Sequence, residues 1–138
     1  MTLRERREAV VHRHVEAECR QDVEGTLASF HLPRYDVKPL GVTHDGEGAV
    51  RELLTGLFVG FPDFSAEVTA LHHADTVVIL EVRMTGTHRG PWAGLEPTGR
   101  AIDVPVACIF EFDEDRLVCE KVYFDFATLK RQLKAGLG

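Results

Sequence analysis

The sequence predicts an α+β fold in which N-terminal helices are covered by a curved antiparallel sheet. Residues 1–60 place apolar side chains mostly at helical spacing, whereas residues 64–125 largely alternate between apolar and polar side chains with a period of two. Helices that lie on one face of an antiparallel sheet form an α+β domain. Because a strongly curved sheet leaves a cavity at its open end, we expect a cone-shaped domain with an internal pocket for a small ligand.

Composition limits the classes of protein that the chain can be. Its 138 residues fit one domain, 1–138, and 44% apolar with 28% charged residues is typical of a globular protein. The formal net charge is −6 and the basic residues are interleaved with acids, so we expect no nucleic acid as a partner. We also expect no membrane segment and a cytoplasmic location, because no apolar run approaches the ~18–20 residues of a membrane helix.

The cysteines and histidines do not predict a metal site. The three cysteines are odd in number and form no CxxC pair. His12 and His14 are two apart on a predicted helix, and His72 and His73 are adjacent in a turn, so the side chains of each pair diverge. We therefore expect no metal and no disulfide framework.

Three helices are predicted before residue 60. The first runs from Leu3 to about Gln21, and Asp22 can cap a second, short helix that ends at Phe30. The third opens at residues 45–48 and ends near Phe58. One face of the first helix carries Val11, His14, Val15 and Glu18. Pro33 and Pro39 interrupt the segment between the second and third helices, which we expect to be a loop with a short extended piece.

Four strands and a terminal helix follow. The strands are expected at 64–71, 76–88, 102–112 and 117–124, and the even-numbered face of the second should point inward. In the last strand, Cys119, Lys121, Tyr123 and Asp125 share one side, and Val118, Glu120, Val122 and Phe124 share the other. The last helix is expected from Phe126 to about Leu133, with Gly136 as its stop.

Four ordered motifs resemble the SnoaL-like polyketide cyclase family, part of the nuclear transport factor two-like superfamily of α+β cones. They are Phe-Pro-Asp-Phe at 61–64, Gly-Thr-His-Arg-Gly at 86–90, Pro-Thr-Gly-Arg at 97–100, and Tyr-Phe-Asp at 123–125 with a following Gln132-Leu133. The resemblance covers nearly the whole chain. It implies a cofactor-independent enzyme that acts on a small apolar carbonyl or polycyclic substrate, by aldol cyclisation or isomerisation.

The resemblance also implies a catalytic role for Asp125, because the characterised cyclases use an aspartate near the end of the last strand as acid and base. A carboxyl in an apolar pocket would have a raised pKa, which suits proton transfer in both directions. The alternative is structural, since Asp125 stands directly before the last helix, where an N-cap belongs.

The other candidate site residues are less well defined. His88 lies at the end of an apolar strand face and could donate a hydrogen bond to an enolate, or could be a buried structural histidine. The residues expected to contact the substrate are Tyr35, Trp92, Tyr123 and Glu111. Tyr35 and Trp92 have surface or interface alternatives, and Glu111 is an acid where a histidine or an amide would suit a cyclase better.

The superfamily hosts many activities, so two other functions stay open. One is a non-catalytic small-molecule binder or association module with the same fold. The other is a hydrolase or dehydratase, which would need further acids aimed at the same point. By resemblance we also expect a homodimer that pairs through the sheet.

Overall fold

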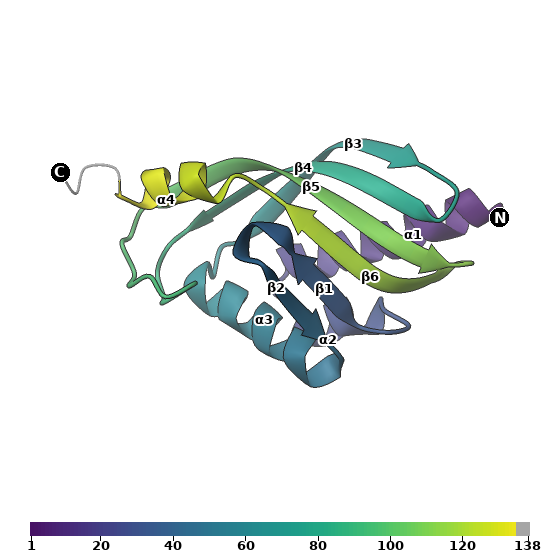
Figure 1. Ribbon diagram of the computed structural model, residues 1–138, viewed down its shortest axis with the longest axis horizontal. Coiled ribbons are helices and arrows are strands. Elements are labelled where there is room, and N and C mark those ends of the chain that lie inside the picture. Colours follow the sequence, from purple (N-terminus) through teal and green to yellow (C-terminus); the bar gives the residue numbers. More distant parts are fainter. Residues whose placement is uncertain (135–138) are drawn as a thin grey trace.

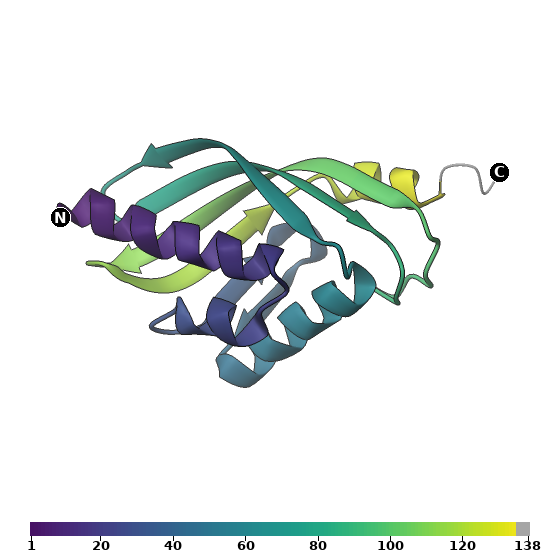
Figure 2. The same ribbon diagram turned by 180° about the vertical axis from the view of Figure 1, so that it is seen from behind.

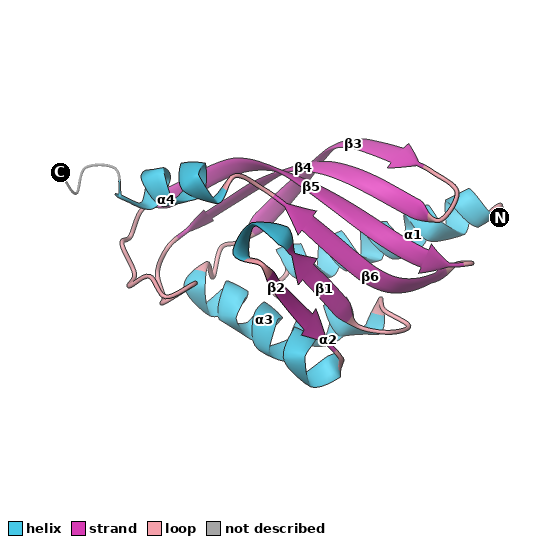
Figure 3. Cartoon of the chain, viewed as in Figure 1, coloured by secondary structure: helices cyan, strands magenta, loops and turns pink. Residues whose placement is uncertain are grey.

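The computed structural model describes residues 1–134 and contains four α-helices, one short 3-10 helix and six strands (Figures 1 and 3). Gly136, the expected helix stop, lies outside the described residues. In chain order the elements are α1 (Leu3–Cys19), α2 (Val23–Ala28), β1 (Arg34–Val37), η1 (Lys38–Leu40), β2 (Val42–Asp45), α3 (Glu47–Gly60), β3 (Ser65–His73), β4 (Val77–Thr87), β5 (Ala101–Asp113), β6 (Arg116–Tyr123) and α4 (Phe126–Lys134).

The strands form one curved sheet in the order β2-β1-β6-β5-β4-β3. Helices α1, α2 and α3 lie on the same face of this sheet, as the view from behind shows (Figure 2). Helix α4 lies at the end of the sheet far from the N-terminus (Figure 1). The predicted α+β class is therefore confirmed.

The sheet is mixed rather than wholly antiparallel, because β1 pairs in parallel with β6. This pairing brings Tyr35 opposite Glu120. Strands β1 and β2 were expected only as a loop with an extended piece. Each has four residues, too few to show a period of two, and prolines at 33 and 39 flank β1.

Local sequence explains where the helices begin. Thr2 and Glu5 form a capping box at the start of α1, and the Asp22 carboxylate accepts from the Gly25 amide at the start of α2, as predicted. The buried residues of α1 form one helix face: Arg7, Val11, His14, Ala17 and Glu18. Three of these five side chains are polar, so this buried stripe must find polar partners inside the protein.

The strand faces also follow the sequence. On β4, Val78, Leu80 and Val82 are buried, which confirms that the even-numbered side faces the helices. Strand β5 is longer than its neighbour β6, whose pairing ends at Ala107. The first part of β5 therefore has no strand partner on the β6 side and can include Pro105. There the Gln132 side-chain amide of α4 takes the place of a strand, because it bonds the backbone N–H and C=O of Asp103 at 2.8 and 2.9 Å.

No helix among residues 1–134 is both long enough and apolar enough to span a membrane.

The loop between β4 and β5 packs tightly against the end of α3. The amides of Arg89 and Gly90 both donate to the Gly60 carbonyl, at 2.9 and 3.3 Å. A Cβ on Gly90 would lie 2.3 Å from the Val59 carbonyl oxygen, and one on Gly60 would lie 2.8 Å from the Cβ of Trp92. Glycine at these positions lets the loop carry Trp92 over the end of α3.

This packing predicts opposite effects for two glycine-to-alanine changes. Gly90→Ala should lower the free energy of unfolding by roughly 1–3 kcal/mol, because the backbone must move to admit the methyl group. Gly56→Ala, in the exposed middle of α3 with no atom within 4 Å, should raise it by roughly 0.5–1 kcal/mol. Urea unfolding of both variants checks this, and equal stabilities would contradict the described loop.

Candidate functional site

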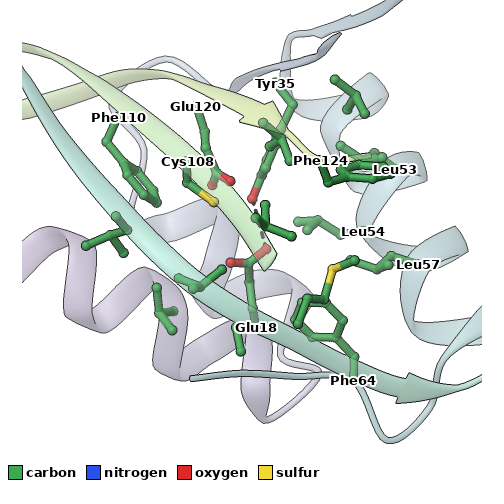
Figure 4. A pocket seen from close by; sticks show the side chains of 18 of the residues that line it. Glu18, Tyr35, Leu53, Leu54, Leu57, Phe64, Cys108, Phe110, Glu120 and Phe124 are labelled. Atoms are coloured by element: carbon green, nitrogen blue, oxygen red, sulfur yellow. Dashed lines mark hydrogen bonds between the residues drawn. The ribbon is translucent and has the colours of Figure 1, made fainter. Parts of the chain in front are cut away.

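A cavity of about 110 Å³ lies between the concave face of the sheet and helices α1 and α3 (Figure 4). Its walls are mainly leucine, valine and aromatic side chains. The polar groups are gathered together, and Figure 4 shows the carboxylates of Glu18 and Glu120 beside the Tyr35 hydroxyl and the Cys108 thiol. The other lining residues are Val15, Val37, Leu40, Leu53, Leu54, Leu57, Phe64, Ala66, Leu80, Val82, Met84, Trp92, Val106, Phe110, Val122 and Phe124.

Three elements supply this polar floor. The buried stripe of α1 carries Glu18 and, one turn earlier, His14. The parallel pairing of β1 with β6 places Tyr35 directly beside Glu120. Cys108 comes from the inward face of β5, and Figure 4 shows its thiol beside the Glu120 carboxylate. The floor therefore depends on the short strand β1 as much as on the long sheet strands.

The His14 imidazole is the centre of the cluster and is fully buried. Its Nε2 lies 2.7 Å from Oε1 of Glu120 and 3.1 Å from Oε1 of Glu18. The same nitrogen is 3.0 Å from the Tyr35 hydroxyl, which itself lies 3.3 Å from Oε2 of Glu18 and can donate to it. One ring nitrogen thus faces two carboxylates and a phenol.

The other ring nitrogen fixes where the proton sits. Nδ1 of His14 is 2.8 Å from Oγ of Ser29, and that hydroxyl donates to the Thr26 carbonyl at 2.6 Å. Since the Ser29 proton is used in this bond, the hydroxyl accepts from Nδ1–H. A proton on Nε2 therefore makes His14 an imidazolium. Phe30 and Phe110 form T-shaped contacts with the His14 ring, with centroids 5.3 and 5.2 Å away.

Electrostatics favours the charged form of His14. Burial alone lowers the pKa of His14, but the two adjacent carboxylates outweigh burial and raise it to about 10. Burial also raises the pKa of Glu120, and the negative charge of Glu18 adds to this rise while His14 opposes it. Burial and the same two carboxylates raise the pKa of Tyr35 well above its ordinary value, so Tyr35 stays a hydrogen-bond donor.

His14, Glu18 and Glu120 are also the one group of three among the described residues whose side chains could hold a metal ion. Their ligand atoms lie within 4.8 Å of one another. The imidazole is correctly oriented for such a role, because Nδ1–H is held by Ser29. A metal would have to displace the Nε2 proton that the two carboxylates hold.

Asp125 is exposed and does not line the cavity. Its Oδ1 accepts from the amides of Ala127 and Thr128, at 3.0 and 3.3 Å, and its Oδ2 accepts from the Thr128 hydroxyl at 2.7 Å. The Thr128 hydroxyl and amide lower the pKa of Asp125, so the expected rise is wrong. This geometry is that of a helix N-cap on α4.

His88 is fully buried beside the loop that carries Trp92, and it does not line the cavity. Its ring stacks on Phe61 with centroids 5.4 Å apart, and its Nδ1 accepts from the Thr98 amide at 3.3 Å. Burial lowers the pKa of His88, so the neutral ring is favoured. These contacts favour the structural alternative.

The four expected substrate contacts divide into two pairs. Tyr35 and Trp92 line the cavity. Tyr123 is 42% exposed and points away from the cavity, because the odd-numbered residues near the end of β6 face outward. Glu111 also lies on the outer face, where its carboxylate pairs with Lys121 at 2.6 Å.

Sequence reasoning did not single out His14, Glu18 or Glu120 as functional, although each gave a signal. His14 and Glu18 share the apolar face of the first helix, and Glu120 shares a strand face with Val122 and Phe124. Ionisable residues on faces that should be buried require partners. The sequence does not predict that these three side chains meet, because their contact depends on the packing of α1 against β6.

The fold places the protein in a structural class. An open six-stranded mixed sheet, with helices on one face, is the nuclear transport factor two-like fold, also called ketosteroid isomerase-like. Within this class, the chain belongs to the SnoaL-like polyketide cyclase family, which matches residues 8–133. The resemblance seen in the four sequence motifs is confirmed. No functionally curated protein matches the sequence.

Solved structures agree with this fold. A protein of Xanthomonas campestris pv. campestris, provisionally described as a polyketide cyclase, has a TM-score of 0.86 and 19% identity over 96% of this chain and 99% of its own. AclR of Streptomyces galilaeus, provisionally described as a hydroxylase, has a TM-score of 0.80 and 22% identity over 96% and 82%. A protein of Catenulispora acidiphila with a ketosteroid isomerase-like fold, in complex with trimethylamine, has a TM-score of 0.77 and 14% identity over 89% and 90%. These identities establish the fold alone.

The buried His14 predicts that stability falls as pH rises. An unfolded chain releases the His14 proton near its ordinary pKa of 6.5, whereas the folded protein holds it to a pKa of about 10. Between these values the folded state binds more protons, so the free energy of unfolding decreases with pH, by on the order of a few kcal/mol over the full window. Glu120 also has a raised pKa in the folded protein, so it too makes the free energy of unfolding decrease with rising pH, beginning at a lower pH.

Urea unfolding at pH 6.0, 6.75 and 7.5 checks this prediction, at pH values below the ordinary cysteine pKa of about 8.5. His14→Gln should be less stable at every pH and should have a flatter dependence. A wild-type free energy of unfolding that stays constant or rises across this range would contradict a charged, buried His14.

The cap geometry of Asp125 predicts different outcomes for two substitutions. Asp125→Ala should lower the melting temperature by roughly 2–8 °C, because the first turn of α4 loses its acceptors. Asp125→Asn should change it little, because asparagine caps helices about as well as aspartate. Differential scanning calorimetry measures both, and equal losses would argue against capping.

Proposed function

We propose that this protein is an acid–base enzyme that moves a proton on a small, largely apolar carbonyl substrate, using its own side chains. Family membership supports the reaction class, which includes aldol cyclisation and isomerisation. The observation that carries the proposal is the convergence of Glu18, Glu120 and Tyr35 on the floor of an apolar cavity, above a buried imidazolium.

Glu120 is the best-placed group to carry the proton. It lines the cavity, and its Oε1 has no well-directed hydrogen bond, although that atom lies 2.7 Å from Nε2 of His14. The contact is thus an ion pair that leaves the oxygen able to accept a proton. A carboxyl whose pKa is raised by burial and by Glu18 can both take a proton from carbon and return it.

The neighbouring groups have distinct roles in this proposal. Glu120 removes a proton from the carbon beside the carbonyl, and the electron pair of that C–H bond moves to form an enolate. The Tyr35 hydroxyl, which remains protonated, turns from Oε2 of Glu18 and donates its one proton to the enolate oxygen. Protonated Glu120 then returns its proton to the product. His14 lies behind the floor and acts as a positioning residue, because its charge holds both carboxylates in place.

The dimensions of the cavity favour a small substrate. Ligand pockets commonly measure about 300–1,000 Å³, whereas this cavity is about 110 Å³. A polycyclic substrate would require the Trp92 loop or α3 to move outward. Trimethylamine, the ligand of one structural neighbour, is an example of a small molecule held by a protein of this fold.

Three other expectations from the sequence are kept as secondary proposals. Hydrolase or dehydratase chemistry was expected to need further acids aimed at one point, and Glu18 and Glu120 supply such a pair at a site other than Asp125. A catalytic Asp125 would need a substrate outside the cavity. A homodimer that pairs through the outer sheet face is implied by the family resemblance, and sedimentation at micromolar protein would test it.

The test of the proposed function is deuterium exchange beside a carbonyl. Cyclopentanone and cyclohexanone in D₂O, followed by proton NMR, report removal of the α-proton without knowledge of the natural substrate. The wild-type protein should accelerate exchange, and Glu120→Gln should reduce the acceleration by about 10²–10⁴-fold. Glu67→Gln, which removes an acid from the exposed face of β3, is the matched control and should have no effect.

Asp125→Asn separates this proposal from the expectation based on family resemblance. It preserves the cap and removes only the ionisable group, so exchange should be retained. Loss of exchange in Asp125→Asn together with full exchange in Glu120→Gln would overturn the assignment of the proton-carrying residue. Ligand binding by a wild-type protein that accelerates no exchange would favour the non-catalytic binder.

A further inference from the structure

We propose that the cavity selects small organic monocations that carry an N–H donor, such as a primary or tertiary ammonium group with an apolar body. The ion would sit with its N–H group on the carboxylates of Glu18 and Glu120 and its apolar part against the aromatic wall. This goes beyond the proposed function, because it names a ligand of the same cavity that need not react there, and it does not require that the site be catalytic.

The charges at the floor of the cavity do not balance. The charged side chains that line the cavity, among the described residues, are Glu18 and Glu120, and both are acidic. Their side chains are only 12% and 4% exposed. The one positive group in contact with them is His14, so the fully ionised cluster has a net charge of −1. A net buried charge is costly, and the cluster must either keep a proton or take up a cation.

Glu120 also has acceptor capacity left for a ligand. Its Oε1 is buried and forms an ion pair with Nε2 of His14 at 2.7 Å, but no donor is well directed at this oxygen. Its neighbours are already engaged, since the Tyr35 hydroxyl is directed to Glu18 and His14, and the Cys108 thiol is a weak donor. A ligand N–H would supply the missing donor, and a charge-assisted bond of this kind is about twice as strong as a neutral one.

The wall of the cavity also suits a cation with an apolar body. The rings of Phe64, Trp92, Phe110 and Phe124 line the cavity, and Figure 4 shows Phe64, Phe110 and Phe124 around the floor. Aromatic faces attract cations, most strongly where water is excluded. The remaining wall is aliphatic and suits alkyl groups. An anion would meet two carboxylates, and a neutral ligand would gain no charge attraction from them.

These observations favour an organic ion over a metal ion. A divalent metal would use Nε2 of His14 as a ligand, but that nitrogen holds a proton between two carboxylates. It would also leave the apolar wall without a function. The cavity volume of about 110 Å³ suits a head group with a few methyl substituents.

The experiment compares three probes that share one apolar body. tert-Butylammonium is a cation with N–H donors, tert-butanol is neutral, and pivalate is an anion. Isothermal titration calorimetry of the full chain at pH 7.5 should show tert-butylammonium binding at least about tenfold more tightly than tert-butanol, and no binding of pivalate. Because the cation displaces a proton from the cluster, the measured heat should depend on the ionisation enthalpy of the buffer, and affinity should rise with pH.

Variants identify the groups responsible. Glu120→Gln keeps the shape of the side chain and should abolish the preference for the cation while tert-butanol binding is retained. Glu67→Gln should keep the preference. Should Glu120→Gln fail to fold, Glu18→Gln gives the same comparison, with a reduced preference expected. Because the probes are unreactive, these results do not depend on catalysis.

Three outcomes would overturn the proposal. One is equal or tighter binding of tert-butanol or pivalate. Another is a cation preference that survives in both Glu120→Gln and Glu18→Gln. The third is tight binding of Zn²⁺ or Mn²⁺, lost in His14→Gln, by a wild-type protein that does not bind tert-butylammonium. Each can occur whether or not ketone exchange is catalysed.

Discussion

The ion pairs between His14 and the carboxylates of Glu18 and Glu120 are the interaction on which the cavity depends. Two buried acids would repel each other without a cation between them, and a buried imidazolium would be unstable without its anions. Removal of any one member therefore leaves an uncompensated charge inside the protein. The cluster also joins α1 to β6, so the same contacts that define the cavity floor hold the helix layer to the sheet.

The short strands at the edge of the sheet have a function that their length does not suggest. Strand β1 pairs in parallel with β6 and so carries Tyr35 to the position beside Glu120. From there the phenol reaches both His14 and Glu18. Elsewhere in the cavity wall, Gly60 and Gly90 allow the loop between β4 and β5 to pack closely against the end of α3, which brings Trp92 to the cavity. Backbone contacts outside the long strands thus position Tyr35 on the floor and Trp92 on the wall.

Periodicity in the sequence was sufficient to predict the long elements, because helix and strand spacing are local properties. The inward face of β4 and the cap of α2 follow directly from residue order, and the cap of α4 was one of two interpretations of Asp125. The parallel pairing of β1 was not predictable, since four residues beside prolines show no period. The site depends on contacts between α1, β1 and β6, which are distant in sequence. For this reason the motif that ends in Asp125 identified the family, whereas the buried polar residues of the cavity were overlooked.

Side-chain ¹⁵N NMR of His14 is the most direct measurement of whether a charged imidazole lies buried beneath the cavity. Spectra of ¹⁵N-histidine-labelled protein at pH 8, assigned with the His14→Gln variant, distinguish imidazolium from neutral imidazole. Both ring nitrogens of His14 should be protonated at pH 8, in accord with a pKa of about 10. A neutral ring that titrates near the ordinary value of about 6.5 would contradict the account.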